Sequence, residues 1–168
     1  MKIHQIINSF SKNLGGAEKL VNMIHCNLRK INISSFILGI LIDNENNLPY
    51  TSSIGLNTTY DLRAFLSIKN YCKNNVADDD IVHAHLFPAN LYCAILKRLG
   101  YIKGKLITTE HNTFNRRRGK MWGRIIDCFI FNSYDDIITV SEGTKSAMEV
   151  WVPQVHKKIS VIQNGILL

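Results

Sequence analysis

Two glycines near the N-terminus stand where a strand-like run ends and a helix-like segment begins. Gly15 and Gly16 lie in "NSFSKNLGGAEKLVNMI", directly after the apolar run "IHQII". Glycine lets backbone N–H groups come close to an anion, and a helix N-terminus adds positive partial charge, so this pattern is typical of a phosphate site. The spacing is not GxGxxG, which gives little support for a dinucleotide site, and a tight turn explains the two glycines equally well.

Polar residues also follow two later apolar runs. His83 and His85 lie in "DIVHAHLFPAN", and Glu110, His111 and Asn112 lie in "TTEHNTFNRRRGK". A histidine pair could ligate a metal, but zinc needs a third or fourth ligand and the sequence specifies none nearby, so we expect hydrogen-bonded histidines and no metal. His111 could hydrogen-bond a substrate hydroxyl, although a structural loop histidine is the simpler interpretation of that residue alone.

A basic run precedes an amphipathic segment that carries Trp122. It consists of Arg116, Arg117, Arg118 and Lys120, in a chain of formal net charge +7. Such a run is usually a solvated helix start, but cations there oppose the helix macrodipole. We therefore expect contact with an anionic membrane surface or a lipid phosphate, with Trp122 near the interface. Nucleic acid is not expected as a partner, because a wider basic face with interleaved aromatic residues is missing.

The elements that must position these residues alternate between strand and helix patterns. Strands are predicted at 3–8, 35–42, 81–85, 105–109, 137–140 and 159–162, with a weaker one around 50–54. Helical apolar spacing runs through 17–28, 62–66, 92–99, 122–129 and 142–151, with Ser141 as an N-cap. Several strands are apolar on both faces, which predicts an α/β fold: a doubly wound, mainly parallel, Rossmann-like sheet of about seven strands with helices on both faces. The carboxyl ends of such strands share one rim, where ligands bind.

Composition indicates one ordinary globular domain over residues 1–168. The hydrophobic content is 46% and the charged content 20%. No apolar run approaches the roughly 20 residues that span a bilayer, and no signal-peptide pattern opens the chain, so we expect a cytoplasmic protein. The four cysteines are scattered and are expected to be reduced thiols. The turn signal at Asn164 and Gly165 suggests a domain that continues into something longer.

Together these residues resemble the N-terminal half of a GT-B glycosyltransferase of the large retaining family 4. Four stretches match in order and spacing: "GGAEKLV", "DIVHAHLF", "ITTEHNT", and "IITVSEGTKSAM" leading to "ISVIQNGI". The resemblance covers essentially the whole chain. It implies that Asn164 and Gly165 form the turn between two domains, and that the C-terminal, donor-binding domain is absent from these residues.

The resemblance also implies an activity and a set of site residues. The full-length protein would be a retaining hexosyltransferase that uses a nucleotide-sugar donor and a cell-envelope glycan or lipid-linked acceptor, without a metal or another cofactor. Gly15 and Gly16 would lie against the donor diphosphate, and His111 would be the catalytic contact to the donor sugar. The acceptor or donor-sugar vicinity would include Glu18, His83, His85, Glu110 and Asn112. The domain by itself is expected to be inactive.

A hypothesis from a different class remains open. A non-catalytic Rossmann-like module that holds a nucleotide or a partner protein would show the same alternation of strands and helices. If the basic run contacts a membrane, we expect this cytoplasmic protein to bind peripherally to the inner face of the cell membrane.

Overall fold

The computed structural model describes residues 1–11, 15–42, 48–114 and 117–163. Within these residues the chain forms one seven-stranded sheet. The strands are β1 (Ile3–Ile7), β2 (Ser35–Leu41), β3 (Thr51–Leu56), β4 (Ile81–His85), β5 (Lys105–Glu110), β6 (Asp136–Thr139) and β7 (Ile159–Val161). The helices are α1 (Gly16–Lys30), α2 (Leu62–Asn75), α3 (Ala89–Arg98), α4 (Met121–Asn132), α5 (Glu142–Trp151) and the 3-10 helix η1 (Pro153–Lys158).

The sheet has the order β3-β2-β1-β4-β5-β6-β7, and every neighbouring pair of strands is parallel. The prediction of a mainly parallel, doubly wound sheet of about seven strands is therefore confirmed, and the weak strand expected around residue 50 is β3. The chain runs outward from β1 to β3 and then returns to β4, beside β1. This reversal of strand order is the point where ligands bind in such sheets.

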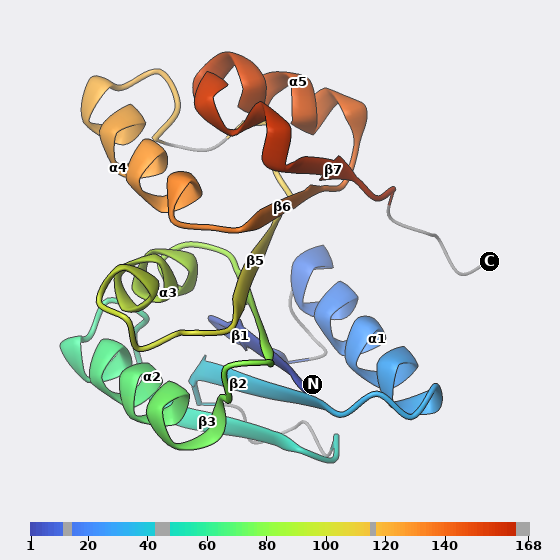
Figure 1. Cartoon of the computed structure of the whole chain (residues 1–168). Helices are drawn as coiled ribbons and strands as arrows, with labels where there is room; N and C mark the ends of the chain where they lie inside the picture. Colours follow the sequence, from blue (N-terminus) through green and yellow to red (C-terminus); the bar gives the residue numbers. More distant parts are fainter. Residues whose placement is uncertain (12–14, 43–47, 115–116, 164–168) are drawn as a thin grey trace.

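Helices cover both faces of the sheet, but unequally (Figure 1). The larger core cluster takes residues from α2, α3, α4 and α5, whereas the smaller one is formed around Val21 of α1. Successive strand residues point to opposite faces, so Ile6 packs in the larger cluster and Ile7 in the smaller. His83 and His85 follow the same rule, since they alternate with Val82 and Ala84 of the larger cluster and therefore point to the α1 side.

The helix ends follow the local sequence. Ser141 caps α5 as expected, with its Oγ accepting a hydrogen bond from the Thr144 N–H at 3.1 Å. Asp61 caps α2 by accepting from the Arg63 N–H at 2.8 Å. In α1, Glu18 lies in the first turn and two basic residues lie in the last, which complements the helix macrodipole.

The cysteines are free thiols in this structure, as expected. Cys72 and Cys93 are buried, while Cys26 and Cys128 are half-buried. Burial raises the pKa of Cys72 to about 12, so this thiol is inert. Among the helices of the described residues, none combines the length and the apolar character needed to cross a membrane.

Candidate functional site

A cavity of about 400 Å³ opens at the carboxyl rim of the sheet, between the start of α1 and the loop after β5. Its lining comes from segments that are far apart in sequence: Gly16, Ala17, Glu18, Leu86, His111 and Asn112. The structure therefore brings together the glycine loop and the histidine loop that the sequence placed on one rim. We call this space the rim cavity.

One wall of the rim cavity is the N-terminus of α1. Gly15 occupies the N-cap position and provides no side chain to satisfy the first N–H groups, and no side-chain cap is formed by the described residues. A Cβ built on Gly16 would meet nothing within 4 Å. The fold itself therefore gives no steric reason for glycine at this position. An uncapped helix N-terminus facing a cavity favours an anion.

The opposite wall carries His111. Burial lowers the pKa of His111, so its imidazole is neutral at neutral pH. Its Nε2 is buried and has no hydrogen-bond partner among the described residues. The unused nitrogen of a neutral ring can accept a hydrogen bond from a bound hydroxyl or donate one to it, depending on the tautomer.

His83 and His85 lie beneath this wall instead of on its surface. His83 is 5% exposed and its Nε2 lies 2.8 Å from the Thr109 Oγ1, while His85 is fully buried. The rings of His83 and His85 have centroids 3.9 Å apart, and those of His85 and His111 6.0 Å apart. Burial, helped by the neighbouring His111, lowers the pKa of His83 to about 3. His83 and His85 are therefore buried, neutral rings that pack beneath His111.

The rings of His83, His85 and His111 lie next to one another without forming a set of metal ligands. Across residues 1–11, 15–42, 48–114 and 117–163, no group of three or more His, Cys, Asp or Glu side chains is arranged to hold a metal ion.

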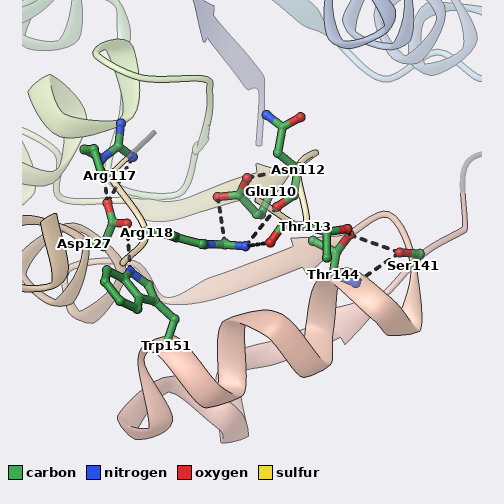
Figure 2. A network of polar contacts seen from close by, with 9 residues as sticks. All are labelled: Glu110, Asn112, Thr113, Arg117, Arg118, Asp127, Ser141, Thr144 and Trp151. Atoms are coloured by element: carbon green, nitrogen blue, oxygen red, sulfur yellow. Dashed lines mark hydrogen bonds and ion pairs between the residues drawn. The ribbon is translucent and has the colours of Figure 1, made fainter. Parts of the chain in front are cut away.

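A buried arginine fixes the loop that carries His111 (Figure 2). The Arg118 Nη1 donates to the Asn112 carbonyl at 3.1 Å and also to the Thr113 carbonyl, and its Nη2 lies 3.8 Å from the Glu110 Oε2. Glu110 Oε1 in turn accepts from the Asn112 N–H at 3.1 Å. Burial raises the pKa of Glu110, and the charge of Arg118 opposes that rise. Glu110 and Arg118 thus act on the loop backbone, while Asn112 lines the cavity.

A second arginine joins the same loop to α4 and α5. The Arg117 Nε donates to the Asp127 Oδ1 at 3.0 Å, and the Arg117 Nη2 forms an ion pair with the same oxygen at 3.0 Å. The Trp151 Nε1 donates to the Asp127 Oδ2 at 3.0 Å (Figure 2). The Arg117 guanidinium also lies 4.0 Å from the centre of the Phe87 ring. Gly123 permits this arrangement, since a Cβ there would collide with the Arg117 carbonyl.

The loop also contacts the start of α5. The Thr113 and Thr144 hydroxyl oxygens lie 3.5 Å apart, and the Ser141 Oγ lies 3.0 Å from the Thr144 Oγ1 (Figure 2). The described residues of the β5–α4 loop therefore contact three elements: β5, α4 and α5.

The predicted membrane contact needs a correction at two residues. Arg117 and Arg118 have side chains that are only 14% and 6% exposed and that form the internal ion pairs above. They are structural groups, because a cation paired with a buried carboxylate is costly to withdraw. Lys120 and Trp122 are exposed, and the Lys120 Nζ lies 5.7 Å from the centre of the Trp122 ring. Arg116, Asn164 and Gly165 lie outside the described residues.

One residue that shapes the rim cavity, Asn8, was not predicted from the sequence. Asn8, which directly follows β1, donates from its amide to the Phe87 carbonyl at 2.9 Å and accepts from the Ala89 N–H at 3.4 Å. It thereby holds the turn that contains Leu86, a non-glycine residue with a φ of 62°. Its position at a strand end was the available signal, since the other rim residues were found by that rule.

The fold and the rim cavity define a class: a doubly wound α/β domain with a polar site at the carboxyl edge of its sheet. A family model, Glycosyltransferase Family 4, matches residues 46–168. The chain belongs to this family, and its fold is that of the N-terminal half of a GT-B glycosyltransferase.

Two solved structures of HepE from Anabaena have the same fold. The complex of HepE with UDP matches with a TM-score of 0.75 at 15% sequence identity, over 99% of this chain and 44% of HepE. The complex with UDP and glucose matches with a TM-score of 0.72 at 14% identity, over 99% and 45% of the respective chains. The chain thus spans less than half the length of HepE. A search of curated proteins gave no match.

Proposed function

We propose that the full-length protein transfers a hexosyl group, with retention, from a nucleotide-sugar donor to a cell-envelope glycan or lipid-linked acceptor. The observation that carries the proposal is the rim cavity, in which the uncapped N-terminus of α1 and the neutral His111 line one space. Membership of a glycosyltransferase family supports the same reaction class. We place the protein in the cytoplasm, on the inner face of the cell membrane, and the proposal includes no metal or other cofactor.

The two walls suit the two ends of such a donor. The first N–H groups of α1 and the helix dipole stabilise negative charge, which grows on the diphosphate as the bond to the sugar breaks. Gly16 leaves room for the diphosphate oxygens, because no side chain stands between the backbone and the cavity. His111 lines the cavity, and its buried Nε2 gains a partner when the ring turns toward a sugar hydroxyl.

The loop geometry supports His111 in this role. Arg118 donates to the carbonyls of Asn112 and Thr113, and these hydrogen bonds restrict the conformations of the loop that carries the His111 ring. Preorganisation of this kind avoids the cost of ordering the loop when a ligand binds. Glu18 and Asn112 complete the lining and are the groups we assign to the acceptor or the donor sugar.

The test is donor hydrolysis by the full-length protein across a panel of nucleotide sugars. UDP-sugars come first, since HepE was crystallised with UDP and glucose. Retention is checked from the anomeric configuration of the transfer product. Hydrolysis of no donor, combined with tight nucleotide binding, would favour the non-catalytic module instead.

Gly16→Ala separates the proposed ligand contact from the fold. Alanine is favoured over glycine in a helix by up to about 1 kcal/mol, so we expect equal or higher stability. The added methyl group enters the rim cavity, so we expect the affinity for the donor to fall by about tenfold, or about 1.4 kcal/mol. Isothermal titration and urea unfolding measure the two effects.

The matched control is Gly143→Ala in the first turn of α5. A Cβ there would meet its nearest neighbour at 3.8 Å, an ordinary contact, and Gly143 does not line the rim cavity. Donor affinity should be unchanged in this variant. Wild-type donor affinity in Gly16→Ala would show that the donor does not bind at the start of α1.

A further inference from the structure

The outward side of α4 carries large apolar residues that stay exposed to solvent in the described part of the chain. Met121 is 84% exposed, Trp122 52%, Ile125 67% and Phe129 40%. Met121, Ile125 and Phe129 are spaced by four residues and Trp122 lies beside them, so the four side chains form one stripe along the helix. We call this stripe the α4 outer face. The helix lies between α3 and α5 in the helical layer and contacts α3 and η1 (Figure 1).

Basic residues border the α4 outer face at both ends. Lys120 contacts the Trp122 ring, and Arg124 is exposed on the helix itself. At the other end, the Arg98 guanidinium lies 5.7 Å from the centre of the Phe129 ring, and the Lys158 Nζ donates to the Asn132 carbonyl at 3.2 Å.

No acidic side chain of α4 balances these cations at the surface. The helix contains one acidic residue, Asp127, which is fully buried and bound to Arg117 and Trp151. Burial of Asp127 therefore removes its charge from the exposed side. The result is an apolar stripe with a positively charged border, in a chain of net charge +7.

We propose that the α4 outer face docks on an anionic phospholipid surface. In that arrangement the apolar stripe enters the boundary between headgroups and acyl chains, Trp122 lies at the interface, and the bordering cations meet lipid phosphates. A second copy of this chain is a poorer occupant. A twofold contact through the same face would bring the two basic borders together without an acidic partner on the exposed side of either α4 helix.

Docking through α4 would bring the rim cavity close to the membrane. The β5–α4 loop that carries His111 runs directly into α4 and is fixed to it through Arg117 and Asp127. A lipid-linked acceptor would then reach the cavity from the bilayer to which the helix is bound. This consequence rests on the proposed function, whereas the docking itself does not.

The experiment is sedimentation of the full-length protein with vesicles. Vesicles of phosphatidylcholine with phosphatidylglycerol are compared with vesicles of phosphatidylcholine alone, at low and high salt. We expect binding to the anionic vesicles that weakens as salt rises. Ile125→Ser and Met121→Ser should each lower the partition coefficient by about tenfold, because each removes a large apolar side chain from the bilayer contact.

Two exposed apolar residues on other helices provide matched controls. Leu62 on α2 is 71% exposed and Val150 on α5 is 80% exposed. Leu62→Ser and Val150→Ser should bind vesicles like the parent. Lys120→Gln together with Arg124→Gln should weaken binding to the anionic vesicles and flatten its salt dependence. Circular dichroism confirms that each variant is folded.

Three results would overturn the proposal. The parent could fail to bind anionic vesicles, Ile125→Ser could bind as well as the parent, or light scattering could show a parent dimer that Ile125→Ser converts to a monomer. Donor hydrolysis without vesicles is measured in parallel. Absent vesicle binding with intact hydrolysis refutes the docking surface and the placement at the membrane but leaves the proposed reaction standing. Intact vesicle binding without hydrolysis refutes only the proposed reaction.

Discussion

Replacing Asp127 with alanine should destabilise the domain strongly. The carboxylate is fully buried and accepts two hydrogen bonds of 3.0 Å, from Arg117 and Trp151. It also forms an ion pair of 3.0 Å with the Arg117 Nη2, and the Arg117 side chain is 14% exposed. Removing one member of a buried ion pair costs about 3–5 kcal/mol, because the remaining charge is left in a poorly solvated place. Arg117 retains limited contact with solvent and its stacking on Phe87, so we expect the lower end, about 3 kcal/mol.

Urea unfolding followed by fluorescence measures this cost. With a slope of about 2 kcal/mol per molar urea, a loss of about 3 kcal/mol moves the midpoint down by about 1.5 M. Asp127→Asn keeps an oxygen acceptor for the Trp151 indole and should lose less. Asp78→Ala breaks an exposed pair with Lys103 and should leave the midpoint nearly unchanged.

The same measurement can refute the reasoning. A midpoint shift below about 0.5 M for Asp127→Ala, with an unchanged slope, would mean that the Arg117–Asp127–Trp151 contacts do not hold the loop. The double variant Arg117→Met with Asp127→Leu checks the cause. It should recover much of the lost stability, because an apolar pair leaves no buried charge behind.

Two further predictions concern the histidines. In the full-length protein, His111→Ala should lower kcat for donor hydrolysis by about 100-fold with an unchanged urea midpoint, and wild-type turnover in this variant would exclude His111 from the reaction. His83 is held neutral, with its pKa lowered from 6.5 to about 3, so the unfolded state binds one more proton between these values. Its contribution to stability is therefore present above pH 6.5 and lost as the pH falls below that value, by about 1 kcal/mol at one pH unit below it. Urea unfolding of His83→Gln should show a correspondingly shallower loss in acid, and an unchanged loss would contradict the assignment.

The sequence predicted the fold well because the relevant signals are local. Runs such as "IHQII" and "SFILGIL" are mostly apolar and are buried on both faces, which is typical of strands in a parallel sheet. Once the sheet is parallel, the strand ends share a rim, so Gly16 and His111 had to lie at the same edge. The cavity between them follows from this topology.

The sequence predicted the surroundings of His111 less well. The basic run was interpreted as a surface feature because its partners, Glu110 and Asp127, lie on separate elements, and local spacing does not show which way the loop turns. One signal was present: Asp127 lies on the buried side of an otherwise apolar helix stripe, and a buried carboxylate requires a cation. The burial of His85 could not be predicted from the sequence either, because it depends on how α1 covers that face of the sheet.

The two glycines that flank the site differ in what constrains them, and this difference has a consequence for sequence variation. Gly123 is required by the fold, since any side chain would strike the Arg117 carbonyl, whereas Gly16 faces open space. In a library scored separately for cellular abundance and for activity, substitutions at Gly123 should be depleted in both scores. Substitutions of Gly16 by small residues should leave cellular abundance unchanged and lower only the activity. A position of that kind reports on the ligand alone.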